Sequence, residues 1–201
     1  MSSIFAFMSR LLHSKQQQRQ LERAIADVKS IGKTHQYLKL GQVYQERKEF
    51  SHALAVYHQV LSKEPNNVTA LWGAAAIELK NKNLQQACIL LQILVRANPD
   101  YRYGEASLAY CQALFDLGDF NAAEHQLDSH LSRWSYPEAL LMMANIKVRK
   151  KNTPDARQIL ETMISNVQNS PSFHYRKHQR HVNAGQRMLK ALPATNCIGQ
   201  A

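Results

Sequence analysis

The sequence predicts an all-α fold, an α-solenoid of about four helical hairpins with a flanking helix at each end. Few residues interrupt helices, because 201 residues contain only 7 glycines and 6 prolines, and no alternating β-branched runs occur. A pattern of small residues and prolines also occurs twice in the sequence. Ala53 and Pro65 recur 34 residues later as Ala87 and Pro99. A fixed period of this length is typical of hairpins that stack and expose a binding surface.

The first 33 residues, 1–33, are predicted to form an N-terminal amphipathic helical segment. Leu21, Ile25 and Val28 recur at helical spacing, and we expect this helix to cover the open side of the first hairpin. The apolar run over residues 4–8 is too short to cross a bilayer, which takes about 20 apolar residues. Two alternatives stay open for it. It packs on the first repeat or on a partner chain, or frays, or else it lies on a membrane surface.

Residues 34–170 are expected to hold the hairpins, at about 34–67, 68–101, 104–136 and 137–170. We expect the second helix of each hairpin to carry a small residue where it crosses the first helix: Ala53, Ala87, Ala123 and Ala156. Gly41 is expected to be small because it meets Ala53. The step from Ala87 to Ala123 is 36 residues, which predicts about two extra residues near 101–103.

Residues 171–193 are predicted to form a basic capping helix, and residues 194–201 a flexible tail. The net charge of +10 is concentrated at the two ends of the chain. Residues 171–201 hold five basic and no acidic residues, and residues 1–33 hold six basic and two acidic ones. An anionic surface would therefore bind at the ends. The candidate cations of the last helix are Arg176, Lys177, Arg180, Arg187 and Lys190.

The repeated positions are Leu40, Gly41, Tyr44, Ala53, Tyr57 and Pro65, followed by Ala74, Ala75, Ala87, Leu91 and Pro99. In this order they resemble the tetratricopeptide repeat, which implies a right-handed solenoid and a binding function. The segments 98–101, 116–119 and 174–180, with Pro171 and Arg187, resemble a poorly characterised bacterial family of divergent tetratricopeptide proteins. That family has no well-established biochemical activity to carry over.

In such a solenoid the first helix of each hairpin lines the concave surface, so the resemblance implies a groove for an extended or helical peptide. Equivalent positions form three rows: Leu38, Trp72, Leu108 and Leu141; Gln42, Ala76, Gln112 and Asn145; Gln45, Leu79, Phe115 and Val148. The amides would pair with the peptide main chain, and Trp72 is the expected anchor. The alternative is that the rows are inter-repeat core or are covered by the N-terminal helix.

We therefore expect a non-enzymatic, cytoplasmic scaffold or adaptor that binds a segment of an unidentified protein partner. The alternative is a component that associates with the inner membrane or a polyanion through its basic ends, with weak contact between residues 1–15 and an anionic surface. Nucleic acid is disfavoured as a partner. The cations of residues 171–192 are not interleaved with several aromatic residues, and no nucleic-acid-reading motif is present.

No catalytic residue, cofactor or metal ion is expected, since the known phosphate-loop, zinc-protease and serine-hydrolase motifs are missing from the sequence. Three widely spaced cysteines argue against a disulfide framework. His174, His178 and His181 share roughly one helix face and could in principle share a metal ion. Because that helix holds no acidic residue and several cations, we expect a solvated, partly protonated basic face instead.

Overall fold

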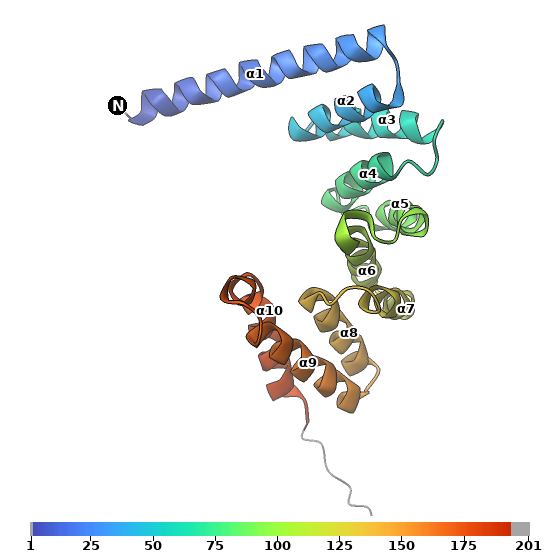
Figure 1. Cartoon of the computed structure of the whole chain (residues 1–201), viewed down its shortest axis with the longest axis vertical. Helices are drawn as coiled ribbons and strands as arrows, with labels where there is room; N and C mark the ends of the chain where they lie inside the picture. Colours follow the sequence, from blue (N-terminus) through green and yellow to red (C-terminus); the bar gives the residue numbers. More distant parts are fainter. Residues whose placement is uncertain (1, 194–201) are drawn as a thin grey trace, which may run out of the picture. The chain divides into compact units, whose positions relative to one another are not determined.

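Helices make up all the regular secondary structure of the computed structural model over residues 2–193, the part of the backbone that it describes (Figure 1). Side chains are described for residues 15–193, so the predicted tail at 194–201 lies outside the described residues. The all-α prediction is confirmed. The helices are α1 (Ser2–Ser30), α2 (Thr34–Glu46), α3 (Phe50–Leu61), α4 (Val68–Lys80), α5 (Leu84–Ala97), the 3-10 helix η1 (Tyr101–Gly104), α6 (Glu105–Leu117), α7 (Phe120–Leu131), α8 (Pro137–Arg149), α9 (Thr153–Gln168) and α10 (Ser172–Ala191).

The chain divides into two compact units, Met1–Ala106 and Ser107–Ala201. In the first unit, α1 packs on α2, α2 on α3, α3 on α4 and α4 on α5. In the second unit, α7 packs on α8, α8 on α9, and α10 on both α8 and α9. Each unit therefore holds antiparallel helix pairs with one further helix packed beside them. Among the helices of residues 2–193, none has the length and apolarity needed to span a lipid bilayer.

Four helices bury an alanine at the same place, the fourth residue from the helix start. Each of these alanines is fully buried: Ala53 in α3, Ala87 in α5, Ala123 in α7 and Ala156 in α9. A methyl group at this position lets a neighbouring helix approach closely, whereas a larger side chain would force the helices apart. The equal register means that the sequence repeat is also a repeat of buried positions.

The turns that join α2 to α3, α4 to α5, α6 to α7 and α8 to α9 share one hydrogen-bond pattern. Two or three residues after the end of each first helix, one residue donates its N–H to the carbonyl five residues back: Glu49 to Tyr44, Asn83 to Glu78, Asp119 to Leu114 and Asn152 to Lys147, at 2.9 to 3.1 Å. The residue before each donor is left-handed: Lys48, Lys82, Gly118 and Lys151, with φ from 60° to 81°. This is the Schellman motif that ends a helix. Three of these four turns place a lysine where glycine is usual.

Tyr57 of α3 is held between two glycines on neighbouring helices. A Cβ atom added to Gly41 of α2 would lie 2.5 Å from Cε1 of Tyr57, and one added to Gly73 of α4 would lie 2.4 Å from its Cζ. Only glycine fits beside the ring on either side. The atoms nearest to Gly41 thus belong to Tyr57 and not to Ala53, which corrects the reason predicted for this glycine.

The outer helices of the two units each bury one apolar face. In α1, Leu21 and Ala24 join a core cluster with Leu40 and Val43 of α2. In the second unit, the buried core that includes Met163 of α9 is completed by α10, mainly through Val182. Both helices therefore cover apolar surface that the neighbouring hairpin would otherwise expose.

Candidate functional site

In the first unit, the structure places six of the predicted partner-binding residues on two helices that contact each other. Leu38, Gln42 and Gln45 lie on α2, and Trp72, Ala76 and Leu79 lie on α4. All six side chains are at least partly exposed, although α1 packs on α2. The buried side chains of α2 in this region are neighbours such as Leu40 and Val43.

Trp72 is packed against residues that follow the second hairpin. Its ring centre lies 6.1 Å from that of Tyr101, and the guanidinium carbon of Arg102 lies 5.5 Å from the indole centre. Arg102 also donates from Nε to Oε2 of Glu105 at 2.6 Å. The tryptophan is therefore held in place by an aromatic ring and a cation, and its exposed part is available as a rigid apolar surface.

The short helix η1 beside Trp72 has an unusual backbone. Arg102, Tyr103 and Gly104 have φ values of 53°, 56° and 86°, so three successive residues are left-handed. Non-glycine residues in this conformation cost free energy and are concentrated at binding and active sites. The segment coincides with the place where two extra residues were predicted. The longer connection contains Tyr101 and Arg102, the two residues that contact the indole ring.

Gln45 is partly committed to a contact within the unit. Its Oε1 accepts a hydrogen bond of 3.0 Å from the hydroxyl of Tyr57. Burial raises the pKa of Tyr57 to about 12, so this hydroxyl remains a donor at neutral pH. The bond fixes which end of the Gln45 amide faces Tyr57. The amide nitrogen is then the group that can donate to the main-chain carbonyl of a bound peptide.

In the second unit, the other six predicted residues lie on α6 and α8, and all are at least partly exposed: Leu108, Gln112, Phe115, Leu141, Asn145 and Val148. Two of their amides donate along their own helices. Gln112 donates to Oδ1 of Asp116 at 2.8 Å, and Asn145 donates to the carbonyl of Leu141 at 2.9 Å. Phe115 packs edge-on against Phe120, with ring centres 5.4 Å apart. This surface is thus mainly apolar, with amide oxygens as its accepting groups.

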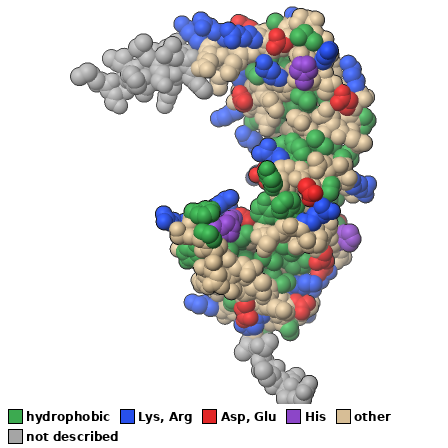
Figure 2. Space-filling model, in the orientation of Figure 1, with side chains coloured by type: hydrophobic (Ala, Val, Ile, Leu, Met, Phe, Trp, Pro, Cys, Tyr) green, Lys and Arg blue, Asp and Glu red, His purple; other side chains and the backbone are tan. Residues whose placement is uncertain are grey.

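The five predicted cations of the C-terminal helix, Arg176, Lys177, Arg180, Arg187 and Lys190, are all exposed on α10. A second basic row was missed by the sequence analysis. Lys15, Arg19 and Arg23 are exposed at intervals of four residues on α1, and Figure 2 shows Lys and Arg side chains gathered along this helix. Residues four apart lie on one side of a helix, so the row forms a single basic stripe. The prediction of membrane contact through residues 1–15 rests on side chains that, apart from Lys15, lie outside the described residues.

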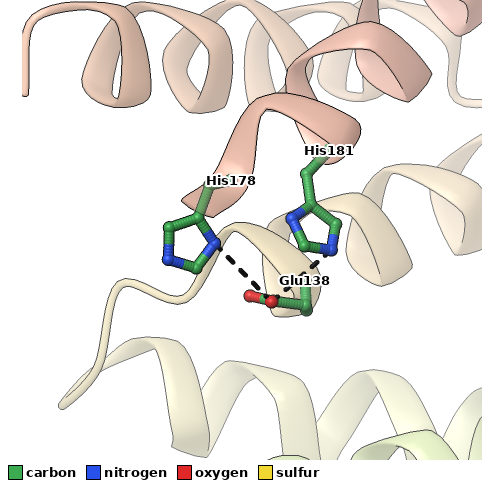
Figure 3. Close-up of side chains that lie close together, drawn as sticks. All are labelled: Glu138, His178 and His181. Carbon is green, nitrogen blue, oxygen red and sulfur yellow. Dashed lines mark ion pairs between the residues drawn. The ribbon is translucent and has the colours of Figure 1, made fainter. Parts of the chain in front are cut away.

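The prediction that the histidines of α10 form a solvated face is wrong. His178 and His181 are buried, with 5% and 8% of their surface exposed. Both rings point at Glu138, in the first turn of α8 (Figure 3). His174 instead lies with Nδ1 3.0 Å from Oγ of Ser170. The acidic partner was missed because it lies on another helix, and no pattern within residues 171–193 points to Glu138.

Two family models of the tetratricopeptide repeat match the chain, one over residues 38–102 and the other over residues 138–170. The chain therefore carries divergent tetratricopeptide repeats in these two segments. Its matched segments cover most of the helices α2 to α5 and the pair α8 and α9. A comparison with curated proteins gives no match.

Solved structures with this tetratricopeptide fold are similar over most of the chain. MamA from Desulfovibrio magneticus RS-1, residues 41 to the end, is 18% identical with a TM-score of 0.64, covering 82% of this chain and 94% of that one. A tetratricopeptide repeat protein from Parabacteroides merdae is 17% identical with a TM-score of 0.65, covering 95% and 79%. YrrB, described as a TPR protein with an unusual peptide-binding site, is 14% identical with a TM-score of 0.62, covering 85% and 92%.

Proposed function

We propose that this tetratricopeptide-repeat protein is a protein–protein interaction scaffold that binds a segment of a partner protein on the exposed side of α2 and α4. The observation that carries the proposal is the setting of Trp72. A partly exposed indole is held by Tyr101 and Arg102 on a left-handed backbone segment. Preorganised aromatic residues dominate the energetics of protein interfaces, because they bury a large area at little entropic cost.

The chemistry of this surface suits a peptide with apolar side chains. An apolar side chain of the partner would pack on Trp72 with Leu38 and Leu79 around it, while the amide nitrogen of Gln45 donates to a main-chain carbonyl. The corresponding apolar residues of α6 and α8, such as Phe115 and Leu141, offer a further contact surface in the second unit. The description of YrrB as peptide-binding supports this reading of the fold.

The test is replacement of Trp72 by alanine in the full chain, followed by affinity capture from native lysate and identification of the captured proteins. We expect Trp72→Ala to weaken capture of the specific partner at least about 30-fold, the effect of losing an aromatic hot spot of 2 kcal/mol. Ile89→Ala is the matched control, since Ile89 is a 52% exposed apolar residue on α5 of the same unit. Equal capture by the wild type and by a folded Trp72→Ala variant would contradict the proposal.

A second candidate function rests on the basic stripe of α1. Lys15, Arg19 and Arg23 would attract an anionic membrane surface at about 1 kcal/mol for each cation close to it. The exposed cations of α10, such as Arg176 and Lys177, would add to the same attraction. In this function the protein is a peripheral component that the membrane holds by charge, and its repeats remain free to bind a partner.

A further inference from the structure

Glu138, His178 and His181 form a compact group within the second unit. Oε1 of Glu138 lies 3.6 Å from Nδ1 of His178 and 3.4 Å from Nε2 of His181 (Figure 3). One ligand atom from each of the three residues can be chosen so that all lie within 4.8 Å of one another. The histidines come from successive turns of α10, and the carboxylate comes from α8, on which α10 packs.

The two separations from Glu138 are close to those of atoms that share one metal ion. Zinc binds histidine nitrogen and carboxylate oxygen at about 2.0–2.2 Å in a tetrahedron, which places neighbouring ligand atoms about 3.3–3.5 Å apart. The two distances to Glu138 are within about 0.3 Å of this spacing. Two imidazoles and one carboxylate are also a ligand set that zinc enzymes use, with a water molecule in the fourth position.

Some polar atoms of the group lack hydrogen-bond partners. Nδ1 of His178 and Oε2 of Glu138 are buried and make no hydrogen bond within the described residues. Buried polar atoms normally have a partner in the protein, a water molecule or an ion. The contacts between the rings and the carboxylate are longer than the usual N–H···O range, so they do not satisfy these atoms. One cation at the centre of the group would satisfy Nδ1 of His178 and would bind the carboxylate of Glu138 through its other oxygen, Oε1.

The charges around the group favour neutral imidazoles. Burial lowers the pKa of both His178 and His181, which outweighs the opposite effect of Glu138. Lys177 and Arg180 lower these pKa values further. Neutral imidazole is the form that binds a metal ion, so at neutral pH no proton has to be displaced from these rings. Arg180 is the competitor, because its Nε lies 3.3 Å from Nε2 of His181 and donates to it.

We propose that Glu138, His178 and His181 bind one zinc ion, or another first-row divalent transition metal, which joins α10 to α8. The ion is held by Oε1 of Glu138, Nδ1 of His178 and Nε2 of His181, with water completing the tetrahedron. Glu138 keeps 27% of its side chain exposed, which leaves a route for the ion. Arg180 is exposed and turns away to release the nitrogen of His181. The site uses no residue of the proposed peptide surface, so the two proposals are independent.

The experiment is calorimetric titration of the full-length, chelator-treated chain without a histidine tag, using zinc chloride under reducing conditions at neutral pH. We expect one ion per chain with Kd of about 1 µM or tighter, and a rise in Tm with added zinc. Cobalt should give the visible absorption bands of a tetrahedral nitrogen and oxygen site, without the sulfur charge-transfer band that bound cysteine would add. Thiolate bands in place of these would overturn the proposal.

Three variants separate this site from adventitious binding. Glu138→Gln and His181→Gln each remove one ligand with little change in shape, and we expect each to weaken zinc binding at least about 30-fold. His125→Gln changes an exposed histidine on α7 and should leave the affinity within about twofold of wild type. Arg180→Ala removes the competing donor and a repelling charge, so it should tighten binding severalfold. Zinc affinity that is unchanged in folded Glu138→Gln and His181→Gln variants would overturn the proposal, as would no binding at about 100 µM zinc.

Discussion

At the scale of single residues, the ring of Tyr57 determines which side chains its neighbours can have. It is 1% exposed and lies against Gly41 on one side and Gly73 on the other. The ring has no room to move away from a larger residue on either helix. Its hydroxyl is also tied to Gln45, so the same side chain links the packing of the first two hairpins to the proposed peptide surface.

We therefore expect Gly73→Ala to destabilise the chain. Overpacking costs up to about 3 kcal/mol, and alanine returns about 1 kcal/mol of helix propensity, which leaves a loss of about 2 kcal/mol. For a chain of this size that is a fall in Tm of about 4–8 °C. Gly185→Ala is the matched control, since the atom closest to its new methyl group is the terminal Cε of Met163, at 2.6 Å, which can swing aside. The next atoms, of Ile164, lie at 3.5 Å, an ordinary contact distance. Equal Tm values for the two variants, measured by circular dichroism, would contradict the role of the Tyr57 ring.

At the scale of secondary-structure elements, three of the four hairpin turns contain a residue in an unfavourable backbone conformation. Lys48, Lys82 and Lys151 occupy the left-handed C′ position at φ values near 60°. That conformation costs an L-residue other than glycine about 1–2 kcal/mol. Only the third turn uses glycine, at Gly118. In the three turns with lysine, the hydrogen bonds of the Schellman motif therefore stabilise a backbone conformation that lysine itself disfavours.

Replacing Lys151 by glycine should stabilise the protein. The gain of about 1–2 kcal/mol in the folded state is reduced by the greater freedom of glycine in the unfolded chain, which leaves about 0.5–1 kcal/mol. The reciprocal change Gly118→Ala should destabilise, through backbone conformation alone, because a Cβ atom there meets no other atom within 4 Å. Urea unfolding monitored by circular dichroism measures both changes. A loss of stability in Lys151→Gly would show that the lysine side chain makes a stabilising contact.

Sequence patterns predicted those features that depend on one element at a time. The helices and the buried alanines at Ala53 and Ala87 follow from periodicity within a segment. The turn at Lys151 carries no glycine, so its left-handed backbone gives no signal in the sequence. The pairing of His178 with Glu138 depends on where α10 packs, and the residues of α10 alone indicated a solvated face. A repeat period gives no information about contacts between helices that are distant in the sequence, so these contacts could not be predicted.

At the scale of the whole molecule, the charge of the chain is its most uneven property. The net charge is +10, and residues 34–170 contribute only +1 of it. The remainder belongs to the two ends, which include the exposed stripe of Lys15, Arg19 and Arg23 on α1 and the cations of α10. A nearly neutral repeat region between basic ends suits a protein whose ends bind an anionic surface while its repeats bind a partner.

The stripe gives a prediction about lipid binding. In co-sedimentation with vesicles, we expect the full chain to bind when the lipids include phosphatidylserine and to remain in solution with phosphatidylcholine alone. Arg19→Glu with Arg23→Glu should abolish most of the binding, and so should about 0.5 M salt, which shortens the screening length to about 4–5 Å. Lys82→Glu with Arg96→Glu, which makes the same change in net charge at two exposed cations of the repeat region, is the control. Salt-independent binding would show that apolar contact dominates.

The packing of Tyr57 also limits how this array of hairpins could be rearranged by evolution or design. Repeat arrays commonly grow and shrink by copying whole units, which works when every unit presents the same surface to the next. Here the residues equivalent to Tyr57 in the later hairpins are leucines, at 91, 127 and 160. The residues equivalent to Gly73 in α6 and α8 are Ala109 and Met142. The first hairpin can therefore be followed only by a hairpin that leaves room for the ring of Tyr57. If the first hairpin were moved or duplicated, the hairpin that follows it would need a glycine at the position of Gly73.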